Sequence, residues 1–332
     1  MVGGAFFWLI CKNTALRKFP VIPMSRLSPT LSLLIPATVA LAFKGVIVKL
    51  AYAEQMGVLA VLCLRFAFAA PLFWLGYWWL REPRQVPLQW RDWLSCTGAA
   101  VLFFLATLCD FTALSLTGVA LSRIILFTYP ALVVAADSVR RRRWPATRTW
   151  VGFLLAYGGL IPVMAPRGLE ARSTADLLGA LWAFGAAASY AGYLLLSQPI
   201  MQRTGSVRFT AVSGTVTLLI FLLYAPLTAG PGDFRVTASG TGWVALMAVA
   251  CTVVPFFLLF EGIRRASAAE ASLVTLAAPV VTVSGAYVFL GERLSPVQFL
   301  GFVLVMLGIG VIKDVAVLPR RWRPGKAGSQ VR

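Results

Sequence analysis

The sequence predicts an all-α membrane protein with ten transmembrane helices arranged as two inverted five-helix repeats. Of its 332 residues, 59% are hydrophobic and only 13% are charged, and the mean hydropathy is +0.81. These values lie far outside the averages of globular domains, so the composition excludes a water-soluble protein. The other two observations behind the prediction are a series of apolar segments of membrane-spanning length and an internal repeat.

Ten apolar segments are long enough to cross a bilayer, whose hydrocarbon core needs about 20 helical residues, with about 17 to 25 tolerated. The connections between them are short and carry turn-forming and charged residues, for example Glu82-Pro83-Arg84, so they leave no room for a soluble catalytic domain. We expect helices at residues 31–52, 57–80, 93–116, 119–139, 149–166, 177–200, 209–229, 242–263, 268–290 and 297–313.

Basic residues predict the orientation of the bundle. The formal net charge is +18, and its excess lies in connections and tails, which favours a membrane over a nucleic acid as the partner. Lys and Arg stay preferentially on the cytoplasmic side. With the N-terminus inside, 22 of them fall on inner segments, 4 on outer connections and 4 within helices. We therefore expect a bacterial cytoplasmic (inner) membrane protein with both termini in the cytoplasm: an N-terminal segment at residues 1–30 and a basic tail at residues 314–332.

The first 23 residues leave the start of the chain open. The stretch from Val2 to Ile10 is apolar but too short to span, and no basic residue precedes it, so a signal peptide is disfavoured. Met1 and Met24 both remain candidate starts. If Met24 is used, only a few residues precede the first helix.

Several kinds of chemistry are excluded by residue types that the chain lacks. It contains no histidine, which removes His-based triads, His proton relays and the usual zinc sites. Four of the five cysteines lie inside apolar segments and read as buried thiols rather than as a disulfide framework. We expect no catalytic residues, no metal site and no cofactor.

An internal repeat appears when the chain is shifted against itself by 149 residues. The shift places Pro130 on Pro279, Gly152 on Gly301, and Gly159 on Gly308. Residues 31–166 and 177–313 would then be two copies, and because each has five spans, an odd number, the second copy would be inverted. Inverted halves favour two conformations open to opposite sides of the membrane. Pro130 and Pro279 are the predicted helix kinks or hinges. Chance similarity between Ala-, Leu- and Gly-rich helices is the alternative.

Several motifs carry a family resemblance. In the second half they are residues 264–272, Ala278-Pro279-Val280, the stretch Leu290-Gly291-Glu292-Arg293-Leu294-Ser295-Pro296, and Gly301 with Gly308; in the first half they are Leu64-Arg65-Phe66, Ala113-Leu114, Tyr129-Pro130-Ala131 and Gly152. Together they resemble EamA-type transporters of the drug/metabolite transporter superfamily. The resemblance implies ten helices, alternating access, and export or exchange of small metabolites such as amino acids. Residues 140–144 depart from the pattern, so a role for the acidic residue of the Gly-Glu-Arg-Leu motif applies only to Glu292.

Some charged residues near the helix ends have structural interpretations. Ser267 and Glu270 form a capping-box pattern at the start of the ninth expected helix. Glu261 has Arg264 and Arg265 three and four residues further on, which is typical of ion pairing at a helix end. Glu292 closes the ninth helix and is interpreted as fixing the following loop.

Lys49 lies near the outer end of the first helix and can snorkel to the interface, and Asp137 has Arg140 and Arg141 three and four residues further on. Four charged residues remain inside the expected spans: Lys44, Arg65, Asp110 and Arg123. Counted from the outer helix ends, they lie roughly 6 to 12 Å below the outer boundary, at 1.5 Å per residue. This shared layer has an excess of two positive charges. Ionisable residues inside a membrane are by default candidates for function, so the four are predicted to bind substrate or to gate. For Arg123 and Asp110, a simple structural pair is the open alternative.

The types of residue in this layer favour a zwitterionic cargo, since Arg binds carboxylates and Asp accepts from an ammonium. Asp110 is also a candidate carrier of a coupling proton, because its charge state would depend on access to water. Tyr129 and Tyr190 could line the same cavity, with ordinary packing as the alternative.

These observations predict a secondary transporter that moves a small polar, amino-acid-like metabolite outward by alternating access. Its partners would be a small-molecule substrate, with the proton as a candidate coupling ion, and the lipid bilayer; no nucleic acid is expected, and both a monomer and a homodimer remain open. An organophosphate or nucleotide-sugar exchanger of the same superfamily is the close alternative. An intramembrane enzyme is the remote one.

Overall fold

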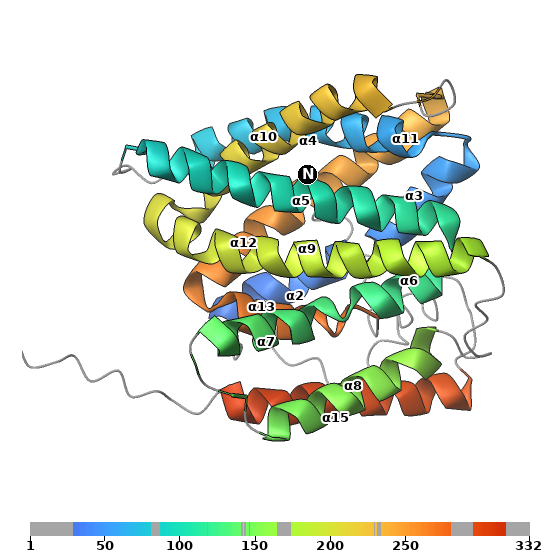
Figure 1. Ribbon diagram of the computed structural model, residues 1–332, viewed down its shortest axis with the longest axis vertical. Helices are drawn as coiled ribbons and strands as arrows, with labels where there is room; N and C mark the ends of the chain where they lie inside the picture. Colours follow the sequence, from blue (N-terminus) through green and yellow to red (C-terminus); the bar gives the residue numbers. More distant parts are fainter. Residues whose placement is uncertain are drawn as a thin grey trace, which may run out of the picture.

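A computed structural model of the chain describes residues 29–80, 87–117, 119–140, 142, 144–145, 147–164, 174–228, 230, 234–279 and 295–316. Within these ranges the chain consists of helices and short connections, without a strand. The helices lie side by side as long, roughly parallel rods (Figure 1). The all-α prediction therefore agrees with the described residues.

The spans, with interrupted ones counted as one, begin and end within about four residues of the bounds expected from hydropathy, where the structure describes those bounds. In the first half they are α2 (Pro29–Ala42), α3 (Lys44–Ala53), α4 (Val58–Leu80), α5 (Trp90–Leu116), α6 (Val119–Leu126), α7 (Tyr129–Arg140) and α8 (Thr147–Met164). In the second half they are α9 (Thr174–Thr204), α10 (Ser206–Thr228), α11 (Ala238–Ala248), the π-helix η3 (Val249–Val253), α12 (Val254–Arg265), α13 (Ala268–Thr275) and α15 (Pro296–Ala316).

Seven helical stretches among the described residues are long and apolar enough to cross a membrane. They are Thr30–Ala53, Val58–Leu80, Trp90–Leu116, Leu121–Arg140, Thr174–Thr204, Ser206–Thr228 and Ala238–Arg265, and Pro296–Ile312 is a shorter apolar helix. Trp78, Trp79 and Trp90 are strongly exposed where α4 ends and α5 begins. Exposed tryptophans at helix ends are typical of the boundary between lipid and water.

Several of the expected spans are interrupted. The first is divided at Phe43, between α2 and α3, and the eighth contains the π-helix η3. The fourth is divided at residues 127–128, between α6 and α7, two to three residues ahead of Pro130. Proline has no N–H for the carbonyl four residues earlier, and it disfavours helical geometry at the residue before it. The break ahead of Pro130 follows from this local chemistry.

The same break recurs in the second half at the predicted offset. Helix α13 ends at Thr275, a turn covers residues 276–277, and Pro279 follows. The bounds of α6 and α13, Val119–Leu126 and Ala268–Thr275, differ by 149 residues at both ends. Pro130 and Pro279 therefore follow helix interruptions at matching positions of the two halves.

Helices α8 and α15 pack through glycines, at the lower edge of the bundle in Figure 1. A Cβ atom at Gly308 would lie 2.5 Å from the carbonyl oxygen of Gly152, and one at Gly159 would lie 2.5 Å from that of Gly301. Such distances leave no room for a side chain, so the two backbones touch. Because the earlier glycine of each helix meets the later one of the other, α8 and α15 run antiparallel.

An aromatic core fills the centre of the bundle between α4, α5, α9, α10 and α12. Phe103 of α5 stacks on Tyr193 of α9 at 4.7 Å between ring centroids, and it meets Phe256 of α12 edge-on at 5.4 Å. Phe66 stacks on Phe221 at 5.5 Å. These rings give the neighbouring polar cavity a rigid apolar wall.

Candidate functional site

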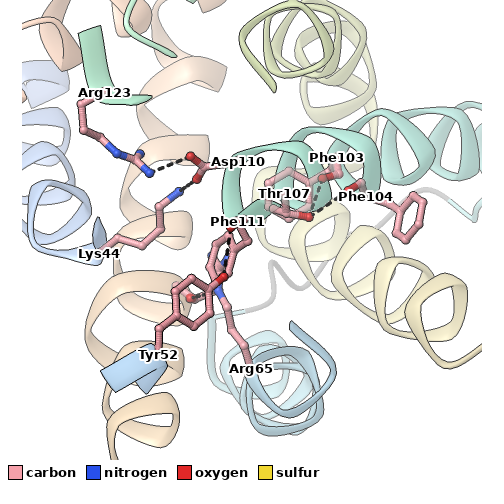
Figure 2. Close-up of polar contacts among 10 residues, drawn as sticks. Lys44, Tyr52, Arg65, Phe103, Phe104, Thr107, Asp110, Phe111 and Arg123 are labelled. Carbon is pink, nitrogen blue, oxygen red and sulfur yellow. Dashed lines mark hydrogen bonds and ion pairs between the residues drawn. The ribbon is translucent and has the colours of Figure 1, made fainter. Parts of the chain in front are cut away.

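The centre of the candidate site is a buried carboxylate held between two cations. Asp110 of α5 accepts from Lys44 Nζ at 2.8 Å through Oδ2 and from Arg123 Nη2 at 2.6 Å through Oδ1 (Figure 2). The Asp110 side chain is 5% exposed. Each carboxylate oxygen therefore has its own cationic partner, and the three side chains form one buried ion-pair cluster.

The two helix interruptions in the first half position these cations. Lys44 is the first residue of α3, directly after the break at Phe43, and the N–H groups of Val46 and Ile47 donate to the Phe43 carbonyl oxygen at 3.1 and 3.2 Å. Arg123 lies in the eight-residue helix α6, just ahead of the other break. Short helix segments can thus place charged side chains at a depth where a continuous span would carry apolar ones.

Arg65 of α4 is the third cation and has different surroundings. It is 1% exposed, its Nε donates to Thr252 Oγ1 at 2.8 Å, and its guanidinium carbon lies 5.2 and 5.4 Å from the ring centroids of Phe66 and Phe111. Its Nη1 has no hydrogen-bond partner among the described residues. Arg65 is therefore oriented by a neutral hydroxyl and two rings, and it has no ion pair within the described part of the chain.

A small cavity of about 60 Å³ opens beside these groups. Lys44, Arg65 and Asp110 line it together with Thr107, Tyr129 and Tyr190; its apolar wall consists of Leu41, Phe103, Ala106, Leu126, Ala186 and Phe256. Among the described residues, three cations and one carboxylate surround the space when Arg123, bound to Asp110, is included. The surroundings of the cavity thus carry two excess positive charges, which suits an anionic group of a small molecule.

Two tyrosines predicted from the sequence meet at the cavity. The Tyr129 and Tyr190 rings pack edge to face at 4.9 Å between centroids. The hydroxyl of Tyr129 also forms a hydrogen bond with the hydroxyl of Thr275 at the end of α13. This contact joins the interrupted helix of the first half to the interrupted helix of the second.

The structure brings together all four charged residues that depth counting had placed in one layer. Lys44, Arg65 and Asp110 line one cavity, and Arg123 reaches it through its ion pair with Asp110.

Sequence reasoning missed Thr252 and the π-helix that carries it. Thr252 accepts from Arg65 and donates to the Met247 carbonyl oxygen, five residues earlier, at 3.1 Å. The available signal was a polar residue three positions ahead of Pro255 in an otherwise apolar run. Single π-helical turns are frequent at functional sites.

Of the residues with structural interpretations, Ser267 and Glu261 lie within the described part of the chain, and neither lines the cavity. The Ser267 carbonyl oxygen accepts from the Ala271 N–H at 3.0 Å, and the first N–H of α13, that of Ala268, donates to Gln198 Oε1 at 3.1 Å. The side chain of Glu270 and the whole of Glu292 lie outside the described residues, so the capping box and the loop role stay predictions. The expected ion pairing of Glu261 is present, with Arg264 at 2.8 Å and Arg265 at 2.6 Å.

The fold and the site define a class of protein: a membrane-embedded helical bundle with a small charged cavity at its centre. The EamA-like transporter family matches the chain twice, over residues 28–165 and 177–313, and the chain belongs to this family. It is an integral membrane transporter with a small-molecule substrate.

Similar proteins carry transporter names. The uncharacterized transporter YcbK of Bacillus subtilis (strain 168) is 34% identical over 279 residues, covering 82% of this chain and 88% of that protein. The threonine/homoserine exporter RhtA of Escherichia coli (strain K12) is 30% identical over 174 residues, covering 52% of this chain and 55% of that protein. A solved crystal structure superimposes with a TM-score of 0.70 at 16% identity, over 87% of this chain and 99% of that one, which supports the fold alone.

Proposed function

We propose that the protein is a secondary transporter that exports a small zwitterionic, amino-acid-like metabolite by alternating access. The observation that carries the proposal is the small cavity at which Lys44, Arg65, Asp110 and Arg123 meet, within helices that are otherwise apolar. Charged groups in such a position are costly and mark substrate pathways. A transporter needs this arrangement, whereas a purely structural bundle does not.

The mechanism rests on ten spanning helices in two inverted halves, residues 31–166 and 177–313. Two observations support a repeat: the family matches each half separately, and α6 and α13 end at matching breaks. The antiparallel packing of α8 against α15 through related glycines supports its inversion. Related halves give two conformations of similar energy, each open to one side. Residues 127–128 and 276–277, ahead of Pro130 and Pro279, are the proposed hinges, and the Tyr129–Thr275 hydrogen bond joins the two interrupted spans.

The chemistry of the cavity supports an amino-acid-like substrate. Guanidinium groups bind carboxylates in a planar fork, and a carboxylate such as Asp110 accepts from an ammonium group. The name of RhtA, a threonine/homoserine exporter, points in the same direction over about half of the chain. Asp110 is also the proposed carrier of a coupling proton.

The proposed location is a bacterial inner membrane, with the N-terminal segment (residues 1–30) and the basic tail (residues 314–332) in the cytoplasm. The support is the unequal distribution of Lys and Arg, 22 on one side and 4 on the other.

The test is counterflow in proteoliposomes that contain the purified protein. Vesicles loaded with unlabelled L-amino acids should accumulate a ¹⁴C-labelled mixture of the same compounds, whereas protein-free vesicles should not. An imposed proton gradient should change the rate if Asp110 carries a proton. The excess positive charge also suits an organophosphate exchanger. Vesicles loaded with unlabelled organophosphates are therefore compared for uptake of the same compounds in labelled form. Exchange of organophosphates without exchange of amino acids would refute the amino-acid proposal.

A further inference from the structure

Arg65 is the cation of the cavity whose charge the described residues leave without an ionic partner. Lys44 and Arg123 both contact Asp110, while Arg65 contacts the neutral hydroxyl of Thr252. A buried guanidinium without a counterion is expensive, since burial removes its water and nothing charged replaces it. An anion that enters the cavity would supply what is missing.

The guanidinium is also held in a fixed plane. Its Nε is taken by Thr252 at 2.8 Å, and the rings of Phe66 and Phe111 lie within 5.2 and 5.4 Å of its central carbon. Arg65 lies beside Phe111 in Figure 2, apart from the Asp110 cluster. The buried Nη1 has no partner among the described residues, and Arg65 itself lines the cavity. One donor group, Nη1, is therefore oriented and has no partner within the described part of the chain.

We propose that Arg65 binds the carboxylate of the substrate and that Thr252, on the π-helix, is the positioning residue that holds its guanidinium for this purpose. The inference rests on the proposed function and adds which group of the substrate is recognised and where. A planar carboxylate matches a single in-plane fork. A guanidinium also binds phosphate, and the choice of a carboxylate follows from the amino-acid-like substrate proposed above.

The π-helix orients the Thr252 hydroxyl so that it can accept a hydrogen bond from Arg65. The hydroxyl hydrogen goes to the Met247 carbonyl oxygen at 3.1 Å, five residues earlier. The oxygen is then left as an acceptor directed at Arg65 Nε. A valine at this position has the same shape but no acceptor, whereas a serine retains one.

The experiment compares acids with their amides in the counterflow assay. For the labelled amino acid that wild-type protein exchanges best, the unlabelled acid should compete at least about 10-fold better than its carboxamide, because a charge-assisted hydrogen bond is lost with the carboxylate. Arg65→Gln should raise KM for the acid by about 10- to 100-fold, and Arg65→Lys should recover only part of this loss, since lysine keeps the charge without the fork.

The positioning role of Thr252 has its own readout. Thr252→Val should raise KM for the acid by about 3- to 10-fold with little change in kcat, and Thr252→Ser should restore it. The matched control is Thr217→Val on α10, because Thr217 is equally buried and bonds only the Ser213 carbonyl oxygen of its own helix, at 2.8 Å. The control should leave KM unchanged.

The outcomes separate this inference from the proposed function. Absence of amino-acid counterflow in the wild type would overturn both. Counterflow in which the carboxamide competes as well as the acid, or in which inorganic phosphate competes better than either, would overturn the assignment of Arg65 and leave amino-acid transport standing. If Arg65→Gln does not fold, the acid-to-amide ratio of the wild type and the Thr252 pair still decide the question.

Discussion

Replacement of Asp110 by asparagine tests the ion-pair cluster and its purpose together. Asp110 accepts from two cations at 2.6 and 2.8 Å and is 5% exposed on its side chain. The asparagine side chain would keep one acceptor oxygen but would turn its amide N–H groups toward the second cation. The excess around the cavity would rise from two positive charges to three.

The expected cost follows from this geometry. Removal of one partner from a buried ion pair costs about 3 to 5 kcal/mol, because it leaves a buried charge uncompensated. Asp110 serves two partners, so we expect the upper part of this range for Asp110→Asn. In the double variant with Lys44→Met, the asparagine oxygen can accept from Arg123 alone, and about 2 kcal/mol should return.

The assay measures the free energy of unfolding of purified protein in mixed micelles by titration with SDS, and counterflow in proteoliposomes for the same variants. If Asp110 contacts the substrate, counterflow stays lost in the double variant although stability recovers. Recovery of both would show that Asp110 only neutralises Lys44, the structural alternative that the sequence leaves open. An Asp110→Asn variant within about 1 kcal/mol of the wild type would refute the buried cluster itself.

Three further predictions address the halves and their orientation. Gly308→Ala should lower stability by about 1 to 3 kcal/mol, because its Cβ would meet backbone atoms at 2.5 Å, whereas Gly310→Ala, with nothing within 4 Å, is the neutral control in the same titration. Tyr129→Phe should cost about 1 kcal/mol and be non-additive with Thr275→Val; strict additivity would argue against their hydrogen bond. Arg140→Cys in a cysteine-free background should react in intact cells only with membrane-permeant reagents, and labelling by an impermeant one would reverse the proposed orientation.

The helix bounds could be predicted closely because a bilayer fixes the length of an apolar helix. The bounds of α4, Val58–Leu80, differ by one residue at one end from the expected 57–80. The interruptions inside spans were harder to predict, since they depend on which carbonyls lose their donors and on what satisfies them. Pro130 and Pro279 indicated two of them. The break at Phe43 has no such signal, because no proline lies next to it and the nearest glycine, Gly45, comes two residues later.

The sequence predicts how deep the site residues lie in the membrane, but it does not predict which partners their side chains contact. Depth follows from counting residues along a helix, which placed Lys44, Arg65 and Asp110 in one layer. The rotation of each helix about its axis and the packing of the helices then decide which side chains pair. In the structure Asp110 pairs with Lys44 and Arg123, whereas Arg65 donates to Thr252. Periodicity within α4 carries no information about a hydroxyl on a distant π-helix.

The two halves have corresponding helices, but the charged residues that the structure describes at the cavity all come from the first half. At the repeat offset, Lys44, Arg65, Asp110 and Arg123 correspond to Tyr193, Gly214, Leu259 and Ser272, none of which is charged. The counterpart of Arg65 is used for packing, because a Cβ at Gly214 would lie 2.6 Å from the Phe73 ring. The second half contributes neutral hydroxyls instead, from Thr252 and Thr275.

This asymmetry has a mechanical consequence for the proposed transport cycle. A scaffold of related halves makes the two access states similar in energy, but it does not require both halves to hold the substrate. If the charged groups all belong to the first half, the substrate travels with that half and the second half moves as a neutral wall. Among the contacts between the halves, the hydroxyl contacts of Thr252 and Thr275 can then change between states at the modest cost of neutral hydrogen bonds.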